Sequence, residues 1–496
     1  MKKIVIIGGG VAGLSAGIFA QKNGFESIIL EKNPVLGGEC TGWDRLGYHI
    51  DGCIHWLVGT EEGTGLNELW KTVGALDGVE IYNPETFLSF EFEGETVHLY
   101  RDLERLKSSW LQISPDDKET IEDFYKTIKR LHSFEVPTKK PMDLMNPLEK
   151  IRLMLSMKEA GAVIQKYGRV SLKEYAHRFK HPALRETLAN FVPENYSVFS
   201  IFFALANFTR GQASVPRGGS KAFALRMVER YKNLGGVIKS PREAVELEID
   251  NKQVKHVICS NGESFEADYV VAACDAKVLF ERLLKNKYND PAYENRFNNP
   301  EDYPLASQVL VALGYEGLVE DLPRTLSFQV DPFNIGTDTV KRLQMTNFGY
   351  EPDFSPKGHS ILTFAINQYH DDYEFWNKLK KDNGTYRTEK ERIGKDVLKA
   401  TEQRFPEMKG KLKVIDVATP KTYERYCNAY RGAFMGFMPT VRGKMMEHPG
   451  YIKGLDNIFL SGQWLQPPGG LPNAVITGKD TIMRICKKEK QQFINS

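Results

Sequence analysis

The chain has 496 residues, enough for about three domains of average size. Hydrophobic residues make up 41% and charged residues 26%, with 42 glycines and 24 prolines, a composition that excludes collagen-like, low-complexity and largely disordered chains. The 66 basic and 64 acidic side chains leave a net charge of +2, so the chain has no electrostatic footprint for nucleic acid.

The cysteines and the apolar runs predict the compartment. None of the six cysteines forms a pair at the CxxC spacing, which indicates reduced thiols in a cytosolic protein. No apolar run approaches the roughly 18 residues of a membrane-spanning helix, and the first segment is strand-like rather than a secretory signal. We therefore expect a soluble, cytoplasmic protein.

A glycine-rich turn joins the first predicted strand to the first predicted helix. Residues 3–7 read KIVII, which is typical of a strand buried on both faces. Residues 8–13 read GGGVAG, and a helix is expected over 14–23. This GxGxxG pattern between a strand and a helix predicts a dinucleotide site. The alternative is a glycine turn that binds nothing.

Each position of the turn has a mechanical role. Gly8 permits the tight turn, Gly10 lets the backbone approach a pyrophosphate, and Gly13 lets the helix pack closely on the sheet. The N–H groups at the start of the helix, around Val11 and Ala12, then carry a partial positive charge that favours the phosphates.

The second predicted strand, 27–30, leads into Glu31, eighteen residues after Gly13. This carboxylate is placed to accept hydrogen bonds from a ribose diol. A 2′-phosphate at about 4 Å would be repelled by roughly 1–4 kcal/mol. The site therefore disfavours NADP and suits FAD or NAD.

Further motifs follow along the whole chain. They are a Gly-Gly pair at 37–38, VPRGGS at 215–220, TPKTYERY at 419–426, NIFLSG at 457–462 and PPGGLPNAV at 467–475. With the N-terminal pattern, they resemble the FAD fingerprint of glutathione-reductase-like and amine-oxidase-like flavoproteins. More narrowly, the chain resembles the phytoene desaturase, carotenoid isomerase and retinol saturase superfamily of FAD-dependent oxidoreductases over its full length.

The resemblance implies an α/β fold, with a Rossmann-like FAD-binding domain of the glutathione-reductase and amine-oxidase type and an interleaved α+β substrate domain. We expect the FAD-binding domain to be discontinuous, from residues 1–75, 215–280 and 450–496. The substrate-binding domain then takes residues 76–214 and 281–449. No second GxGxxG occurs, so a dedicated NAD(P)H domain is not expected.

The predicted FAD contacts combine the motif residues with positions carried over from the resemblance. They are Gly8, Gly10, Val11, Ala12, Gly13, Glu31, Lys32, Gly38, Glu39, Cys40, Val245, Gly462, Pro472, Asn473 and Ala474. Pro472 suits the first position of a helix, whose free N–H groups would face the N1–C2=O edge of the flavin. Val245 would meet the adenine through its backbone, although a plain core position is equally compatible. Glu39 departs from the arginine of many amine-oxidase relatives, and Gln463 from the acid of many flavoproteins.

Five segments outside the motifs bear on the substrate domain. Residues 307–314 and 360–366 are expected as strands of one sheet, and 286–302 as a loop. Residues 141–170 combine methionines with Lys and Arg, which fits a basic amphipathic helix on a membrane surface or at a lipid-binding mouth, or a lid packed on the protein. The apolar run 198–205 suits a tunnel lining or plain core.

Catalytic candidates are few. His55 lies in a segment that flanks the isoalloxazine in the relatives, so we consider it as an acid/base or flavin-polarising group; a structural histidine is the alternative. Arg217 and Arg431 could contact flavin or substrate, or form ordinary salt bridges. His177 and His181 have the i, i+4 spacing of metal ligands but lack a matching acid, so no metal site is predicted.

The leading hypothesis is an FAD-dependent oxidoreductase that desaturates or saturates C–C bonds of an apolar isoprenoid or polyene by hydride transfer at flavin N5. The alternatives are a flavin-dependent double-bond isomerase and an amine-oxidase-like enzyme. A non-enzyme alternative is a prenyl or lipid carrier, because the Rab-GDP-dissociation-inhibitor proteins share the fold without flavin. The intact Gly8, Gly10, Gly13 and Glu31 argue against the carrier.

Overall fold

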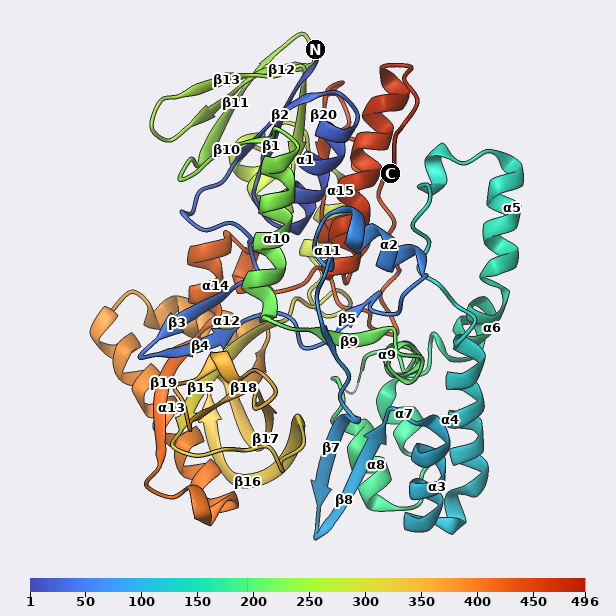
Figure 1. Cartoon of the computed structure of the whole chain (residues 1–496), viewed down its shortest axis with the longest axis vertical. Helices are drawn as coiled ribbons and strands as arrows, with labels where there is room; N and C mark the ends of the chain where they lie inside the picture. Colours follow the sequence, from blue (N-terminus) through green and yellow to red (C-terminus); the bar gives the residue numbers. More distant parts are fainter. Residues whose placement is uncertain (194, 496) are drawn as a thin grey trace.

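A five-stranded parallel sheet forms the upper part of the molecule in the computed structural model, which describes residues 1–193 and 195–495 (Figure 1). Its strands, in spatial order, are β10 (Val237–Lys239), β2 (Glu26–Leu30), β1 (Lys3–Ile7), β14 (Tyr269–Ala272) and β20 (Ile458–Leu460). They come from three separate stretches of the chain. The predicted strand at 3–7 is confirmed, and the following helix, α1 (Val11–Lys22), begins three residues earlier than expected.

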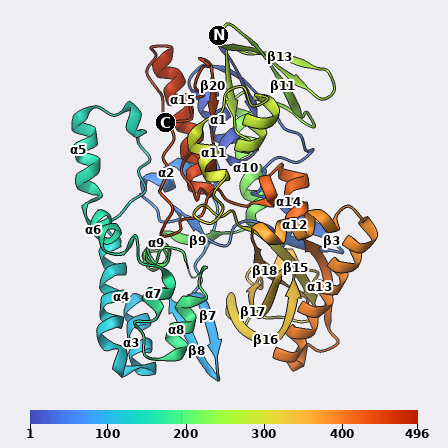
Figure 2. The same ribbon diagram turned by 180° about the vertical axis from the view of Figure 1, so that it is seen from behind.

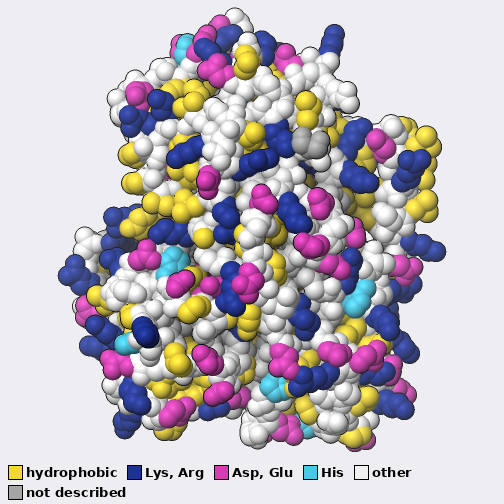
Figure 3. Space-filling model, in the orientation of Figure 1, with side chains coloured by type: hydrophobic (Ala, Val, Ile, Leu, Met, Phe, Trp, Pro, Cys, Tyr) yellow, Lys and Arg dark blue, Asp and Glu magenta, His cyan; other side chains and the backbone are white. Residues whose placement is uncertain are grey.

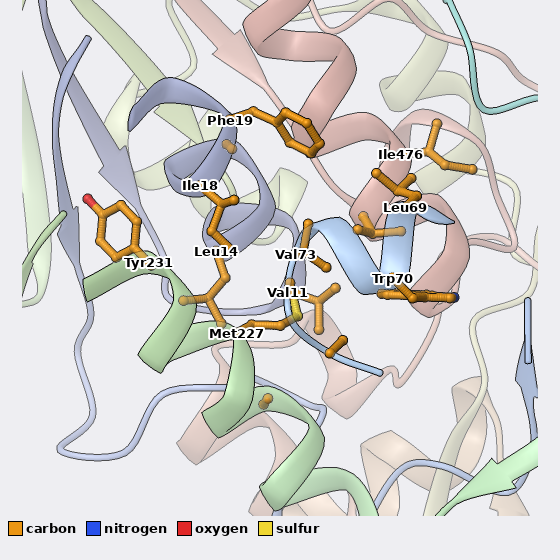
Figure 4. Close-up of a cluster of buried hydrophobic side chains, with 14 of the residues drawn as sticks. Val11, Leu14, Ile18, Phe19, Leu69, Trp70, Val73, Met227, Tyr231 and Ile476 are labelled. Carbon is orange, nitrogen blue, oxygen red and sulfur yellow. The ribbon is translucent and has the colours of Figure 1, made fainter. Parts of the chain in front are cut away.

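The sheet is buried on both faces, as the apolar β1 predicts. Ile4 and Ile6 belong to a core shared with α1, α2 (Gly65–Thr72), α10 (Gly219–Asn233) and α15 (Leu471–Lys488). Val5 and Ile7 point to the opposite core, which includes β11 (Ala244–Asp250) and β12 (Gln253–Cys259). These two strands and β13 (Ser264–Glu266) form a separate antiparallel sheet. Figure 4 shows the first core between the four helices.

A seven-stranded sheet forms the second part of the fold. Its spatial order is β19 (Leu412–Ala418), β15 (Ser307–Tyr315), β18 (Ser360–Gln368), β17 (Asp338–Asn347), β16 (Thr325–Ile335), β7 (Thr86–Phe92) and β8 (Glu95–Tyr100). β15 and β18 are antiparallel neighbours, so the two strands expected at 307–314 and 360–366 are confirmed. The core on one face of this sheet includes side chains of α12 (His370–Leu379) and α13 (Asn383–Arg404).

A helical lobe lies beside β7 and β8 (Figures 1 and 2). It contains α3 (Leu103–Ile113), α4 (Lys118–Leu131), α5 (Pro147–Ser156), α6 (Lys158–Tyr167), α7 (Leu172–Ala176), α8 (Pro182–Ala189) and α9 (Phe199–Thr209). The single helix considered within 141–170 is in fact two, because the chain turns at Met157 between α5 and α6. Among the described residues, no helix is both long and apolar enough to cross a membrane.

Short elements connect these parts. They are β3 (Gly42–Arg45), β4 (Tyr48–Asp51), β5 (Leu57–Val58), β6 (Ile81–Tyr82), β9 (Ala213–Pro216), α11 (Pro291–Phe297) and α14 (Pro420–Cys427). The prediction of a loop over 286–302 was wrong for residues 291–297, which form α11. The Asp290 carboxylate caps this helix by accepting from the Ala292 N–H, and Tyr293 is buried.

Candidate cofactor and substrate site

One cavity of about 1600 Å³ extends from the parallel sheet to the helical lobe. Its wall begins at the ends of β1 and β2, passes His55 and Trp56, and reaches Met142 and Met157 beside α5. Single small-molecule sites are usually about 300–1,000 Å³. The cavity therefore has room for a large cofactor and a second ligand together.

Two helix N-termini without side-chain caps line this cavity. α1 begins after Gly10 and α15 after Gly470, and neither residue has a side chain to bond the first N–H groups. The helices pack closely, since a Cβ at Gly478 would lie 2.4 Å from the Ala12 carbonyl oxygen. The Ser15 hydroxyl also donates to the Val475 carbonyl at 2.7 Å. The free N–H groups of both helices thus present partial positive charge to one space.

The glycine turn has the tight geometry that the motif requires. Gly8 has φ +105°, and a Cβ there would lie 2.4 Å from the Ala273 carbonyl oxygen. A Cβ at Gly13 would lie 2.0 Å from the Gly8 oxygen. At Gly10 a Cβ would meet the protein only at 3.7 Å, at the Gly37 oxygen, so the fold itself would tolerate a side chain there. The missing side chain instead leaves open the space beside the turn, the cradle, into which a diphosphate would fit.

Glu31 lies at the end of β2 in the cavity wall. Its carboxylate accepts from the Gly9 N–H at 2.8 Å and from the Asn33 N–H at 2.8 Å. These backbone donors fix the carboxylate, which retains lone pairs for a ribose diol. The neighbouring Lys32 also lines the cavity, but its ammonium group donates to the Asn428 side chain at 2.7 Å.

The predicted FAD contacts therefore lie together, with two exceptions. The wall includes Gly8, Gly10, Val11, Ala12, Glu31, Lys32, Gly38, Glu39, Cys40, Gly462, Pro472, Asn473 and Ala474. Gly13 lies behind Gly8, where it has the packing role expected of it. Val245 is 42% exposed and stands outside the wall, which Glu243 and Ala244 form instead. Pro472 is the second residue of α15 rather than the first.

The thiol of Cys40, which lines the cavity, is not activated for thiol–disulfide exchange. All six cysteines of the chain are free. Hydrogen bonding to Cys53, together with burial, holds the pKa of the Cys40 thiol well above its ordinary value. The thiol of Cys40 therefore stays protonated, whereas thiol–disulfide exchange requires the thiolate.

Two acids face the cavity beside the cradle, and one of them was missed. Burial, followed by the charge of Asp275, raises the pKa of Glu39 to about 8, and a hydrogen bond from Gln463 acts in the opposite direction. Burial raises the pKa of Asp275 to about 6, although hydrogen bonds from the N–H groups of Tyr430 and Lys277 act to lower it. Asp275 was missed by the sequence analysis. It follows β14, which pairs with β1, and an acid just after a strand at this sheet edge could have been expected to reach the site.

The protonation of Glu39 predicts a pH-dependent cofactor affinity. At about pH 7 Glu39 is neutral; as the pH rises through about 8 it becomes an anion beside the diphosphate cradle. We expect the affinity for FAD to fall about tenfold by pH 9, from like-charge repulsion. Titration of apoprotein with FAD, followed by quenching of flavin fluorescence, measures this. The Glu39→Gln variant should show no such fall. An equal fall in that variant would show that another group causes the pH dependence of FAD affinity.

The segment that carries His55 is held by the 215–220 motif. The Asp51 carboxylate accepts from the Ser220 N–H at 2.5 Å and hydroxyl at 2.6 Å, at the N-terminus of α10. The Ser220 hydroxyl in turn accepts from the Ile54 N–H at 2.8 Å. A Cβ at Gly219 would lie 2.3 Å from the Asp51 oxygen, so only glycine fits there. Asp51 and Ser220 are thus positioning residues for His55.

His55 lines the cavity and is exposed there, so a ligand in the cavity can reach its ring. Its nitrogens make no hydrogen bond to the described residues. Burial, followed by the positive charge of Arg324, lowers its pKa below the ordinary 6.5. His55 is therefore a neutral imidazole at neutral pH, with nitrogens available to a ligand.

Beyond His55 the cavity has an aromatic side. Phe87 packs edge-on against Trp56 at 5.7 Å and against Phe208 at 5.2 Å between ring centroids. Phe199 and Phe203 of α9 continue the wall, while Ile201, Phe202 and Leu205 of the same helix are core. The run 198–205 therefore serves both of the roles considered for it.

The remaining candidates lie outside the cavity wall. Arg217 lies 3.4 Å from Glu80, and Arg431 pairs with Glu374 at 3.2 Å, so both form ordinary ion pairs. His177 is exposed, and the described residues contain no group of His, Cys, Asp and Glu that could hold a metal. The uncapped helix ends, the open Gly10 cradle and the fixed Glu31 fit a dinucleotide diphosphate and ribose.

Comparison with known proteins places this site in a family. The 1-hydroxycarotenoid 3,4-desaturase of Flavobacterium sp. (strain P99-3) is 22% identical, with 97% of this chain and 98% of that protein covered. The all-trans-retinol 13,14-reductase of Danio rerio is 20% identical, with 97% and 86% covered. The crystal structure of an oxidoreductase from Methanosarcina mazei has the same fold, with a TM-score of 0.60, 16% identity, and 97% and 100% covered.

The family described as flavin containing amine oxidoreductase matches residues 11–486. The cofactor is FAD, and the protein is an FAD-dependent oxidoreductase. The chain belongs to the family of flavin-containing amine oxidoreductases.

Proposed function

We propose that this protein desaturates or saturates C–C bonds of an apolar isoprenoid or polyene. The observation that carries the proposal is the continuity of the FAD cradle with the aromatic wall at Trp56 and Phe87 in one cavity. An apolar chain has no polar handles, so stacking and shape must orient it. The relatives named for a carotenoid and for retinol support this substrate class.

The chain's residues divide the work around the cofactor. Bound FAD would supply the hydride acceptor or donor at N5. The free N–H group of Asn473 in the first turn of α15 would stabilise negative charge at the flavin edge, whereas the Ala474 N–H donates to the Gly470 carbonyl at 3.0 Å. A ring nitrogen of His55 accepts or returns the proton of the reacting carbon. Trp56 and Phe87 exclude water from that side.

We further propose that the cofactor-binding unit consists of residues 1–75, 215–280 and 450–496. In support, all five strands of the parallel sheet and helices α1, α10 and α15 fall within these segments. The substrate unit, 76–214 and 281–449, then contains the seven-stranded sheet and the helical lobe.

Product mass is the experiment that tests the reaction. FAD-loaded protein is incubated with all-trans-retinol or lycopene, with an electron acceptor in one series and dithionite in another. Loss or gain of two hydrogens supports desaturation or saturation. An unchanged mass with a shifted retention time would assign the double-bond isomerase instead. Turnover of amines alone would refute the proposal.

We also propose that α5 rests on a membrane surface, at the end of the cavity lined by Met142 and Met157. Leu148 is 68%, Met154 73% and Leu155 68% exposed. The helix stands apart from the rest of the protein in Figures 1 and 2, and hydrophobic and basic side chains gather over it in Figure 3. Lys150 and Arg152 form no ion pair with a described residue, which suits anionic lipid.

Vesicle co-sedimentation tests this contact. We expect the triple variant Leu148→Ser, Met154→Ser and Leu155→Ser to bind phosphatidylglycerol vesicles at least about tenfold more weakly, because each buried apolar side chain contributes about 1.5–3 kcal/mol. The control is Leu318→Ser, a residue 63% exposed on the other lobe. Equal loss in the control, or none in the triple variant, would contradict the contact.

A further inference from the structure

The cavity has a polar side as well as an aromatic one. Strands β15 to β18 of the seven-stranded sheet turn polar side chains towards it. They are Gln308, Thr325, Ser327, Gln344, Thr346 and Asn367. A pure hydrocarbon would remove water from these groups and offer them no hydrogen bond, which is unfavourable. The polar side therefore fits a substrate that has a polar part.

Two arginines stand on this polar side, and their surroundings differ. Arg342 is satisfied by the protein, since it donates to the Glu91 carbonyl at 2.6 Å and to the Ser327 hydroxyl at 3.2 Å. Arg324, just before β16, is not satisfied. Its Nε and Nη2 atoms are buried and have no hydrogen-bond partner, and it forms no ion pair, among the described residues. Buried donors without a partner are unfavourable, unless a ligand supplies the hydrogen-bond acceptors that the protein does not.

Arg324 lies between two spaces. It lines the large cavity near His55, and it also lines a smaller polar pocket of about 680 Å³ with Arg217 and Glu351. The guanidinium carbon lies over the Tyr350 ring, 5.5 Å from its centroid, and this cation–π contact supplies no hydrogen-bond acceptor in the plane of the guanidinium. Arg324 thus has no carboxylate partner among the described residues, and its Nε and Nη2 atoms stay unpartnered at the boundary of the substrate space.

We propose that the substrate carries a carboxylate at one end of its apolar chain and that Arg324 binds it. This inference rests on the proposed function, because it assigns the polar end of the same substrate. A guanidinium pairs with a carboxylate through two parallel N–H···O bonds, and the unpartnered Nε and Nη2 of Arg324 supply two such donors. The apolar chain then lies along Trp56 and Phe87, and the polar side bonds the head group and its water.

Matched ligands test the head group. Binding of all-trans-retinoic acid and of methyl retinoate to FAD-loaded protein is measured by quenching of tryptophan fluorescence, to which Trp56 in the wall contributes. We expect the acid to bind at least about tenfold more tightly than the ester, since buried charged hydrogen bonds are strong. In the Arg324→Gln variant the affinity for the acid should fall by that factor, and the affinity for the ester should not change. The Arg324→Lys variant should retain part of the preference for the acid.

Arg217→Gln is the matched control, because this arginine lines the small pocket but not the large cavity. It should keep the full preference for the acid. Equal affinities for acid and ester in the natural protein would overturn the proposal, as would an unchanged preference in Arg324→Gln. The readout needs no turnover: if both retinoids bind but the flavin is never reduced, the redox function fails while the head-group assignment stands.

Discussion

Gly10→Val should yield a folded protein that purifies without FAD. The backbone at Gly10, with φ −76° and ψ −179°, is accessible to valine, and its Cβ would meet the protein at ordinary distances, 3.7 Å from the Gly37 oxygen. The side chain would instead occupy the space between the N-terminus of α1 and Gly38, where the diphosphate has to approach the backbone. We expect no flavin absorbance at ~450 nm and a far-UV circular dichroism spectrum like that of the natural protein.

Gly161→Val is the control for this substitution. Gly161 lies in α6, and a Cβ there meets nothing within 4 Å. This variant should purify yellow, with a normal ratio of flavin to protein. A yellow Gly10→Val protein with ordinary FAD affinity would show that the cofactor does not lie against the glycine turn.

His55→Gln should slow the chemical step by about 10²–10⁴-fold, the usual contribution of a positioned acid or base. Binding should change little, because glutamine retains the size and polarity of the side chain. In the desaturating direction, in which His55 accepts the proton, the rate of the natural protein should fall as the pH falls through the lowered pKa of His55, since the imidazolium form has no lone pair to accept a proton. Stopped-flow measurement of flavin absorbance against pH reads both effects.

His177→Gln is the matched histidine control, because His177 is exposed on the surface of the helical lobe. It should leave both the rate and the pH profile unchanged. If His55→Gln keeps its rate and its pH dependence, His55 is a structural residue, and the proton passes through another group in the cavity.

The parts of the site that depend on local sequence could be predicted. The strand at 3–7, the glycine turn and Glu31 lie within one βαβ unit, so their spacing alone places them together. The start of α15 after Gly470 is likewise indicated by the neighbouring Pro472, and the end of the short strand 458–460 by Gly462. Their burial in a common wall follows from the parallel sheet.

The rest depends on contacts between distant segments. Asp275 reaches Glu39 only because β14 pairs with β1. Arg324 faces the cavity only because β16 pairs with β7 and turns the sheet towards the helical lobe. The backbone contact of Val245 with the adenine stays a prediction, because the cavity wall at the start of β11 contains Glu243 and Ala244 but not Val245. The helix at 291–297 differs from the expected loop although a proline begins it. A proline suits the first turn of a helix when an N-cap such as Asp290 precedes it.

Anaerobic titration of the bound flavin tests the claim that a yellow cofactor and an unsaturated hydrocarbon chain meet in one cavity. Oxidised holoprotein is mixed with retinol or a carotene, and dithionite-reduced holoprotein with the corresponding more unsaturated compound, without oxygen. We predict that absorbance at ~450 nm falls in the first case or returns in the second, in proportion to the polyene consumed. A flavin that never responds to polyenes but is bleached by amines would contradict it.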